Sequence, residues 1–257
     1  RPPAQRMGGR RALANVSESY LAAAVQAAGP AGSHPVAAAV PEEGGELLAS
    51  GLEWLGCQVS RSQQKGVPVF AARQGGRELA VWTEQGAPLS REEVLLLTCL
   101  ALLEAGERVI ALPSEAPAAA ERLIHSLDGQ VKQGPWVGRQ RCLGDALFAA
   151  CLIVRQLQHS GQPLTELVRQ LPGCRVQRRV IPLHGGRSAV MGALSKRFPD
   201  ARRMEHGMRV DLEGGSVWVA PAGNQEALRL AAEGPEAEIA RELCDFMARE
   251  ASQWDRL

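Results

Sequence analysis

Strand-like and helix-like patterns alternate along most of this chain, and this alternation constrains its fold more than any single motif. Short apolar runs between turn residues indicate strands, and apolar residues spaced three and four apart indicate amphipathic helices. Strands are expected over residues 36–40, 57–60, 67–72, 78–83, 108–112, 130–133, 175–183, 208–212, 216–220 and 227–231. Helices are expected after residues 15–17 and over 47–55, 90–105, 116–127, 144–159, 163–171, 187–198 and 236–254. This order of elements favours an α/β fold class.

The alternation divides the chain into three successive units. Its 257 residues are about 1.7 times the usual domain length of ~150, which allows two or three compact units. Residues 1–13 are rich in Pro, Gly and Arg and are expected to form a flexible lead-in. The units then cover residues 14–87, 88–173 and 174–257. The first two read as α/β and the last as a smaller α+β unit.

Two helix starts carry clear local signals. Ser90-Arg-Glu-Glu93 has the spacing of a capping box, in which the Ser hydroxyl and the Glu carboxylate satisfy backbone N–H groups at the helix start. Asp145 follows Gly144 at another expected helix start, where a carboxylate is favoured by the helix dipole. Trp54, Trp82 and Trp218 fall within apolar patterns and are expected in the core.

Charge and hydropathy exclude several classes of partner. The formal net charge is +1, which provides no overall field to attract nucleic acid or an anionic membrane. The longest apolar run, residues 94–103, is broken by Thr98 and is far shorter than the ~20 residues of a membrane-spanning helix. No secretory signal pattern is visible, and the six cysteines contain no Cys-x-x-Cys pair. We therefore expect a cytoplasmic protein with reduced, buried thiols and with neither nucleic-acid nor membrane partners.

The sequence contains no strong catalytic motif. The five histidines, His34, His125, His159, His184 and His206, are scattered and lack metal-ligand spacing. The Gly-rich turn His184-Gly-Gly-Arg187 leads into an expected helix, an arrangement that can bind phosphate but is equally typical of an ordinary strand–helix loop. No P-loop, dinucleotide-binding or nucleophile-elbow motif is present.

Taken in order, the segments resemble the last three domains of the α-D-phosphohexomutase superfamily. The resemblance rests on residues 36–60, on Arg77–Gly86 followed by Pro88-Leu-Ser90, on Gly144-Asp-Ala-Leu147 and on Gly207-Met-Arg-Val-Asp211. It covers residues 14–250 in collinear order. The resemblance implies two successive phosphohexomutase-like α/β domains followed by a smaller α+β domain similar to the TATA-box-binding protein.

The residues that make such an enzyme active have no counterpart here. Active members carry the phosphoryl group on a Ser-His-Asn-Pro loop in a first domain, which nothing in this chain matches. They hold Mg²⁺ with Asp-x-Asp-x-Asp-Arg, and the matching positions here are Ala72, Gln74 and Gly76, with only Arg77 retained. Mg²⁺ prefers anionic oxygen ligands. We therefore expect no metal, no other cofactor and no catalytic residue in this chain.

Two further loops differ from the family pattern. The sugar-selecting Gly-Glu-x-Ser-Gly-His motif is missing from the short stretch 134–143. The phosphate loop Arg-Pro-Ser-Gly-Thr-Glu-Pro is matched by Ala220-Pro-Ala-Gly-Asn-Gln-Glu226, which lacks the Arg and the Ser. The surviving arginines suggest a residual phosphosugar site, and the candidates for it are Arg73, Arg77, Arg187 and Arg229.

This pattern of losses is similar to the mutase-like C-terminal region of bacterial nucleotidyltransferases of the mannose-1-phosphate guanylyltransferase type. Leu112-Pro-Ser-Glu-Ala-Pro117 and Val219–Glu226 carry that similarity. It implies a non-catalytic module with a structural, oligomerising or sugar-phosphate-sensing role. This similarity implies an N-terminal nucleotidyltransferase domain in the parent protein, and the first residue, Arg rather than Met, fits a C-terminal fragment. A homo-oligomer is a further expectation. The alternative is a fragment of a phosphomannomutase or phosphoglucomutase that interconverts hexose 1- and 6-phosphates.

Overall fold

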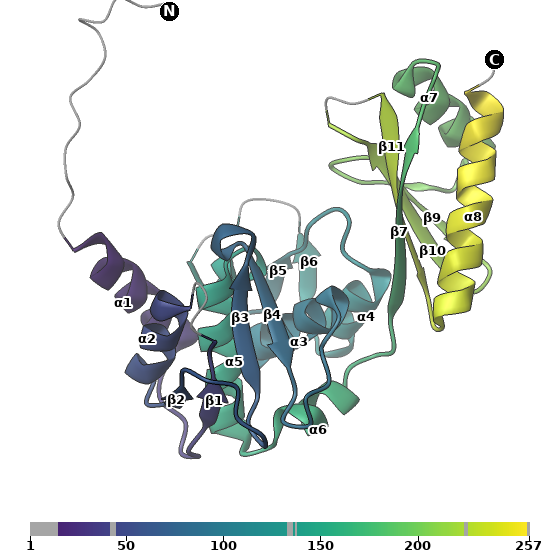
Figure 1. Ribbon diagram of the computed structural model, residues 1–257. Helices are drawn as coiled ribbons and strands as arrows, with labels where there is room; N and C mark the ends of the chain where they lie inside the picture. Colours follow the sequence, from purple (N-terminus) through teal and green to yellow (C-terminus); the bar gives the residue numbers. More distant parts are fainter. Residues whose placement is uncertain (1–14, 42–44, 133–135, 137, 224–225, 256–257) are drawn as a thin grey trace, which may run out of the picture.

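The computed structural model describes residues 15–41, 45–132, 136, 138–223 and 226–255. The lead-in expected at residues 1–13 lies outside these ranges. Figure 1 shows two bodies side by side, a larger one built from the first two units and a smaller one built from the last. The α/β fold class expected from the sequence is confirmed, with two sheets that contain parallel strands followed by an antiparallel sheet.

The first sheet is mixed and has the strand order β2-β1-β3-β4. Strand β1 pairs in parallel with β2 and β3, whereas β4 returns antiparallel to β3 as the expected hairpin. The apolar side chains Leu48 and Leu52 of helix α2 are buried, as their helical spacing predicts. The elements of this segment are α1 (Val16–Ala28), β1 (Ala37–Ala39), α2 (Glu46–Trp54), β2 (Gln58–Ser60), β3 (Val69–Arg73), the 3₁₀ turn η2 (Gln74–Gly76) and β4 (Glu78–Trp82).

The middle segment is mostly helical around a two-stranded parallel sheet, β5–β6. The predicted capping box is confirmed, because Glu93 N–H donates to Ser90 Oγ at 3.1 Å and Ser90 N–H donates to Glu93 Oε2 at 2.7 Å. The elements are α3 (Arg91–Glu104), β5 (Val109–Ala111), α4 (Ala118–Ser126), β6 (Gln130–Lys132), the 3₁₀ helix η3 (Gly138–Leu143), α5 (Ala146–Ser160) and α6 (Leu164–Arg169).

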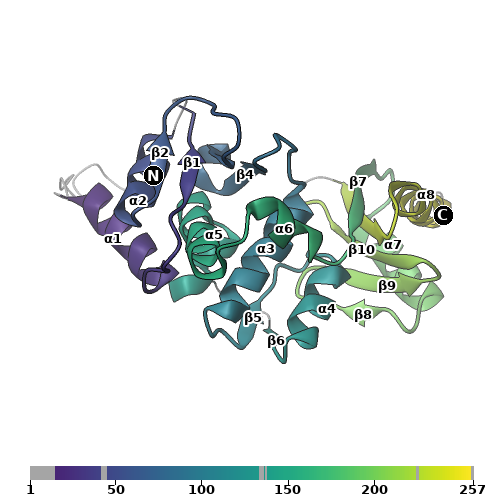
Figure 2. The ribbon, with the colours of Figure 1, turned by 90° about the horizontal axis from the view of Figure 1, so that it is seen from below.

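Helix α5 lies at the centre of the larger body. Its start is capped as predicted, with the Asp145 carboxylate accepting from Leu147 N–H at 3.0 Å and Phe148 N–H at 3.2 Å. Most of its side chains are buried, and it packs on α1, α2, α3, β3 and β4 (Figure 2). A helix that is apolar on nearly all sides must be covered on all of them. One continuous hydrophobic core consequently runs from Leu21 to Cys174.

The smaller body is an antiparallel sheet of order β7-β11-β10-β9-β8 with two helices on one face. Alternate residues of β10 point to opposite faces: Val217 and Val219 pack with α7 and α8, whereas Trp218 and Ala220 pack on the other side. The elements are β7 (Arg175–Pro182), α7 (Arg187–Arg197), β8 (Arg202–Arg203), β9 (Met208–Leu212), β10 (Gly215–Pro221), β11 (Ala227–Gly234) and α8 (Ala237–Trp254).

Buried ionic contacts join the two bodies at the start of α4. Glu233 of β11 accepts hydrogen bonds from the backbone N–H groups of Ala118 and Ala119, and from Arg122 at 2.8 Å. Arg209 of β9 is 2% exposed and donates to Glu121 Oε1 at 2.6 Å. The first turn of α4 therefore fixes the antiparallel sheet against the larger body.

One residue and one strand differ from what the sequence predicts. Trp218 is buried as expected, but Trp54 is 52% exposed, so its expected core position is wrong. It is the last residue of α2 and lies outside the set of buried positions of that helix, which ends at Leu52. The two-residue strand β8 was not expected. No helix within the described ranges is both long and apolar enough to cross a bilayer.

Candidate functional site

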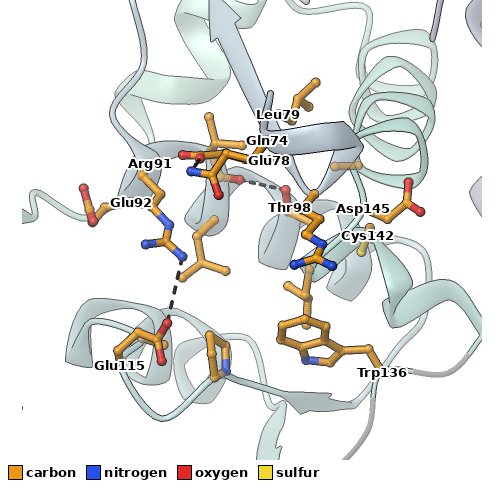
Figure 3. Close-up of a pocket in the computed structure, with 18 of the residues that line it drawn as sticks. Gln74, Glu78, Leu79, Arg91, Glu92, Thr98, Glu115, Trp136, Cys142 and Asp145 are labelled. Atoms are coloured by element: carbon orange, nitrogen blue, oxygen red, sulfur yellow. Dashed lines mark hydrogen bonds and ion pairs between the residues drawn. The ribbon is translucent and has the colours of Figure 1, made fainter. Parts of the chain in front are cut away.

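A cavity of about 310 Å³ opens where the three segments of the chain meet (Figure 3). The turn between β3 and β4 forms one wall, and Glu115 and Trp136 lie opposite it. The start of α3, the η3–α5 junction and Arg178 of β7 complete the lining. The polar and aromatic lining residues are Gln74, Arg77, Glu78, Arg91, Glu92, Thr98, Glu115, Trp136, Asp145 and Arg178.

Most charges around this cavity already have partners. Arg178 lies 2.5 Å from the buried carboxylate of Glu92, which joins β7 to α3. Arg91 and Glu115 form a longer pair at 3.9 Å across the opening. These contacts offset the cost of placing charges in a partly desolvated site.

Arg77 differs from these paired groups. Its exposed guanidinium makes neither a hydrogen bond nor an ion pair with any residue in the described ranges, although it lines the cavity. Trp136 is held in place by a hydrogen bond from its indole N–H to Ala111 O at 2.8 Å, and its ring lies against Gly144. The cavity therefore offers an available cation and an aromatic surface that is 38% exposed.

The lining does not contain an activated nucleophile. The described part of the lining includes neither serine nor histidine, and the Thr98 hydroxyl donates to Val94 O at 2.7 Å within its own helix. Burial raises the pKa of the Cys142 thiol well above its usual value, so this group is not a thiolate at neutral pH. Asp145 is engaged as the cap of α5 and accepts the Tyr20 hydroxyl at 2.5 Å. Burial, followed by this hydrogen bond, raises the pKa of Tyr20.

The turn that matches the family's Mg²⁺ loop does not suit a divalent cation. Ala72, Gln74 and Gly76 provide no carboxylate, and Arg73 and Arg77 flank the turn with positive charge. The nearby carboxylate Glu78 accepts a hydrogen bond from Gln74 Nε2 at 2.5 Å. Within the described residues, no group of three or more His, Cys, Asp or Glu side chains is placed to hold a metal ion. The residues present therefore do not fit Mg²⁺.

The Gly-rich turn before α7 binds the chain's own carboxylates. The N–H groups of His184 and Gly185 donate to Asp255 at 2.7–2.9 Å. The N–H of Arg187 donates to Glu226 Oε2 at 3.3 Å, and the Arg187 side chain donates to Gly223 O. Backbone donors that would bind a phosphate at a helix start are thus already used by acidic side chains.

The four arginines proposed from the sequence do not form one cluster. Of these, Arg77 lines the cavity, whereas Arg73 is exposed at the end of β3 and outside the lining. Arg187 begins α7, and Arg229 of β11 lies over the Trp218 ring at 5.3 Å. Whether any of them contacts a phosphosugar stays a prediction.

Sequence reasoning missed most of the residues that shape the cavity. Arg91, Glu92 and Arg178 come from positions far apart in the chain, and nothing local marks them as neighbours. Glu92 was hidden within the capped start of α3, where acidic residues are ordinary. The one available signal was Trp136, an aromatic residue in a Pro- and Gly-containing loop.

Comparisons with known proteins agree on the fold. No family model matches the chain. A sequence relative from Methanopyrus kandleri, named "Probable phosphoglucosamine mutase", is 26% identical over 205 residues, covering 68% of this chain and 45% of that protein. A phosphoglucomutase/phosphomannomutase family protein from Burkholderia thailandensis superposes with a TM-score of 0.67 and 14% identity, covering 91% of this chain and 64% of that one.

A second solved structure is similar across the same region. It is the N-acetylphosphoglucosamine mutase of Aspergillus fumigatus, with a TM-score of 0.56 and 12% identity, and the match covers 91% of this chain and 65% of that one. This chain spans less than half of the Methanopyrus relative and less than two thirds of either solved chain. The described fold is therefore that of the phosphohexomutase structures, present here as a part of their length.

Proposed function

We propose that this chain is a non-catalytic phosphohexomutase-like module that binds a sugar phosphate in the cavity between its three segments. One observation carries the proposal: the β3–β4 turn presents to the cavity the guanidinium of Arg77, which pairs with none of the described residues, and the turn has no carboxylate cluster. The place that would hold a cation in an active relative is thus suited to an anion.

The cavity chemistry supports this class of ligand. A guanidinium pairs with phosphate oxygens through two parallel N–H···O bonds, which gives both strength and direction. The Trp136 ring, fixed through Ala111 O, presents a flat apolar surface to the same space. Pockets that combine an apolar surface with a few placed polar groups are typical ligand sites.

The same residues argue against phosphoryl transfer. That reaction depends on metal ions and cations that neutralise charge on the migrating group, and on a positioned nucleophile. The residues at 72, 74 and 76 do not fit Mg²⁺, and the described lining includes neither serine nor histidine. Binding without turnover is the activity that these side chains support.

Calorimetric titration with mannose 1-phosphate and GDP-mannose tests the binding proposal. The wild-type chain should release heat, and Arg77→Met should weaken binding by at least about tenfold because it removes a charge-assisted contact. Arg73→Met is the matched control, since Arg73 lies on the same hairpin but outside the lining. Flat heats at millimolar ligand, or equal losses in both variants, would contradict the proposal.

The second candidate function is hexose-phosphate mutase activity in a longer protein. Similarity to proteins named as phosphosugar mutases favours it. It requires Mg²⁺ binding and interconversion of hexose 1- and 6-phosphates. Titration of the wild-type chain with MgCl₂ should give no heat, whereas Ala72→Asp combined with Gln74→Asp should introduce weak binding. Turnover of a hexose phosphate by the full-length parent would favour the mutase.

The parent protein is the remaining part of the proposal. The degenerate loops are consistent with a nucleotidyltransferase of the mannose-1-phosphate guanylyltransferase type, with this module at its C-terminal end. The coding sequence upstream of Arg1 distinguishes the candidates, because a Gly-x-Gly-x-Arg loop indicates the nucleotidyltransferase and a Ser-His-Asn-Pro loop the mutase. Homo-oligomerisation and a cytoplasmic location stay predictions, and sedimentation of the intact parent tests the first.

A further inference from the structure

A second cavity, of about 600 Å³, lies at the other ends of the helices that border the first. The cavity described above is lined by the starts of α3 and α5, whereas this one is lined by their C-terminal halves together with Gly29, Pro30 and α6. The two cavities share no lining residue.

The second cavity contains a buried guanidinium with no acidic partner among the described residues. Arg155 of α5 is 6% exposed. Its Nη1 donates to the neutral amide of Gln158 at 2.5 Å, and its Nε has no hydrogen-bond partner. Burial lowers the pKa of Arg155, yet a guanidinium stays protonated at neutral pH because its usual pKa exceeds 12. A positive charge therefore lies in a largely buried position, and no acidic side chain of the described residues pairs with it.

A second arginine and a histidine also line this cavity. Arg139 donates to Ala27 O and to Ala105 O, both at 2.6 Å, and its remaining charge is shared with Glu107 at the longer distance of 3.9 Å. His159 lies one turn after Arg155 on the same helix face and contacts Pro30 O at 3.2 Å. Glu104, which is exposed, is the one acidic side chain that the described residues contribute to the lining.

We propose that this second cavity binds a small organic or inorganic anion through a carboxylate or phosphate group held by Arg155 and Arg139. An uncompensated buried charge is costly, and an anion that forms charge-assisted hydrogen bonds with it recovers that cost. The volume accommodates more than a bare ion. Because the ligand would contact α3, α5 and α6 together, binding stabilises the packing of these three helices.

Phosphate and citrate are the probes that test the site. Comparing them shows whether it prefers a phosphate or a carboxylate ligand. Calorimetry and thermal unfolding are run on the whole chain carrying Arg77→Met, which removes the anion-binding group of the first cavity. We expect one anion to bind at millimolar concentration or tighter and to raise the Tm above that in NaCl of equal ionic strength. The better probe identifies the phosphate or the carboxylate class.

Arg155→Met, added to that background, should weaken binding at least about tenfold and abolish the Tm increase. Arg241→Met on α8 is the matched control, because it removes an exposed guanidinium whose ion pair, with Glu238 at 3.4 Å, lies on its own helix and far along the chain from this cavity. If Arg155 had only a structural role, Arg155→Met would lower the Tm without anion and leave the anion-induced increase unchanged. That result would overturn the proposal. The absence of binding by either anion at about 10 mM, which corresponds to a binding free energy weaker than about −3 kcal/mol, would also overturn it.

Glu104→Gln provides a second test, in which the affinity for the anion should increase. Because Glu104 is exposed, this substitution should not disturb folding. Removing this exposed carboxylate relieves repulsion of the incoming anion, so affinity should increase about two- to fivefold at low salt. The site is contradicted if Glu104→Gln leaves the anion affinity unchanged and Arg155→Met also binds as tightly as its background. It is likewise contradicted if Glu104→Gln leaves the affinity unchanged and Arg155→Met fails to fold. Loss of mannose 1-phosphate binding in Arg77→Met is a separate result that bears on the first cavity alone.

Discussion

Single carboxylates in this protein satisfy backbone groups that lie far from them in sequence. Asp255, at the end of α8, accepts hydrogen bonds from the N–H groups of His184 and Gly185. These bonds, that of Gly185 first, lower the pKa of Asp255 below its ordinary value of 3.8. The carboxylate is therefore bound more favourably in the folded state than its protonated form.

The pH dependence of Asp255 follows from the sign of this shift. A carboxyl group with a lowered folded-state pKa stabilises the fold above its unfolded pKa and loses that contribution as pH falls through the folded value. We predict that Asp255→Asn lowers the Tm at pH 7, and that the difference from wild type shrinks as pH falls below about 4. Parallel Tm curves from pH 7 to pH 3 would contradict the assignment.

The cysteines give a second prediction for individual side chains. Burial raises the pKa of all six thiols, to about 12 for Cys57, Cys99, Cys151 and Cys174. Because the thiolate is the reactive form, a thiol reagent such as DTNB should modify the native chain very slowly at pH 8 and all cysteines rapidly in guanidinium. Rapid modification of one native cysteine would show that its burial is incomplete.

At the scale of helices, caps come from two sources. Helix α3 carries its own capping box, whereas the residues preceding α4, α6 and α7 provide no capping side chain. These three starts are satisfied instead by Glu233, Glu84 and Glu226 from other segments. A remote cap links the formation of a helix to tertiary packing, since the carboxylate arrives only when the segments dock.

Local and remote caps should respond differently to mutation. Ser90→Ala should lower the free energy of unfolding by about 1 kcal/mol. Glu84→Gln should lower the free energy of unfolding by a similar amount, about 1 kcal/mol. It should also increase amide hydrogen exchange within α6 and around residue 84. Urea denaturation and exchange mass spectrometry measure both effects. An increase in exchange confined to residue 84 would show that α6 does not depend on this contact.

This distinction explains how much of the structure the sequence predicts. The helix starts at Ser90 and Asp145 and the β3–β4 hairpin have local signals, and the structure confirms them. The Arg178–Glu92 pair, the strand β8 and the contacts of Arg155 depend on segments that meet only after folding. Trp54 has an apolar character but lies on an exposed end of α2, which periodicity over a short helix does not resolve. The absence of carboxylates at positions 72, 74 and 76 could be predicted directly, because it depends on residue identity alone.

At the scale of the whole molecule, ionic contacts rather than a shared core join the two bodies. Their buried hydrophobic clusters are separate, one ending at Cys174 and the other beginning at Ile181, and the half-buried side chain of Val176 in β7 is the apolar contact between the bodies among the described residues. Arg209, Arg202 and Glu233 of the smaller body contact Glu121, Arg122 and the backbone at the start of α4. Polar joints of this kind are specific, but they are sensitive to the loss of one charged partner.

Arg209→Met should therefore weaken docking of the antiparallel sheet onto the larger body. Removing one partner of a buried pair costs about 3 kcal/mol, and separate cores allow the two bodies to unfold in distinct steps. We expect calorimetry to resolve two transitions in this variant. Arg202→Met is the control, since its exposed pair with Glu121 should contribute less than about 1 kcal/mol. A single cooperative transition in Arg209→Met would contradict this account of the joint.

The central position of α5 has a consequence for synthesis on the ribosome. Strands β1–β4 leave the exit tunnel early, but the helix that covers their apolar face is translated only after α3, β5, α4 and β6. Until then the nascent first sheet exposes a hydrophobic surface, and such surfaces attract chaperones and invite aggregation. A stalled chain that ends before Ala146 should thus remain protease-sensitive and chaperone-bound, and protection should begin only once Ser160 has emerged.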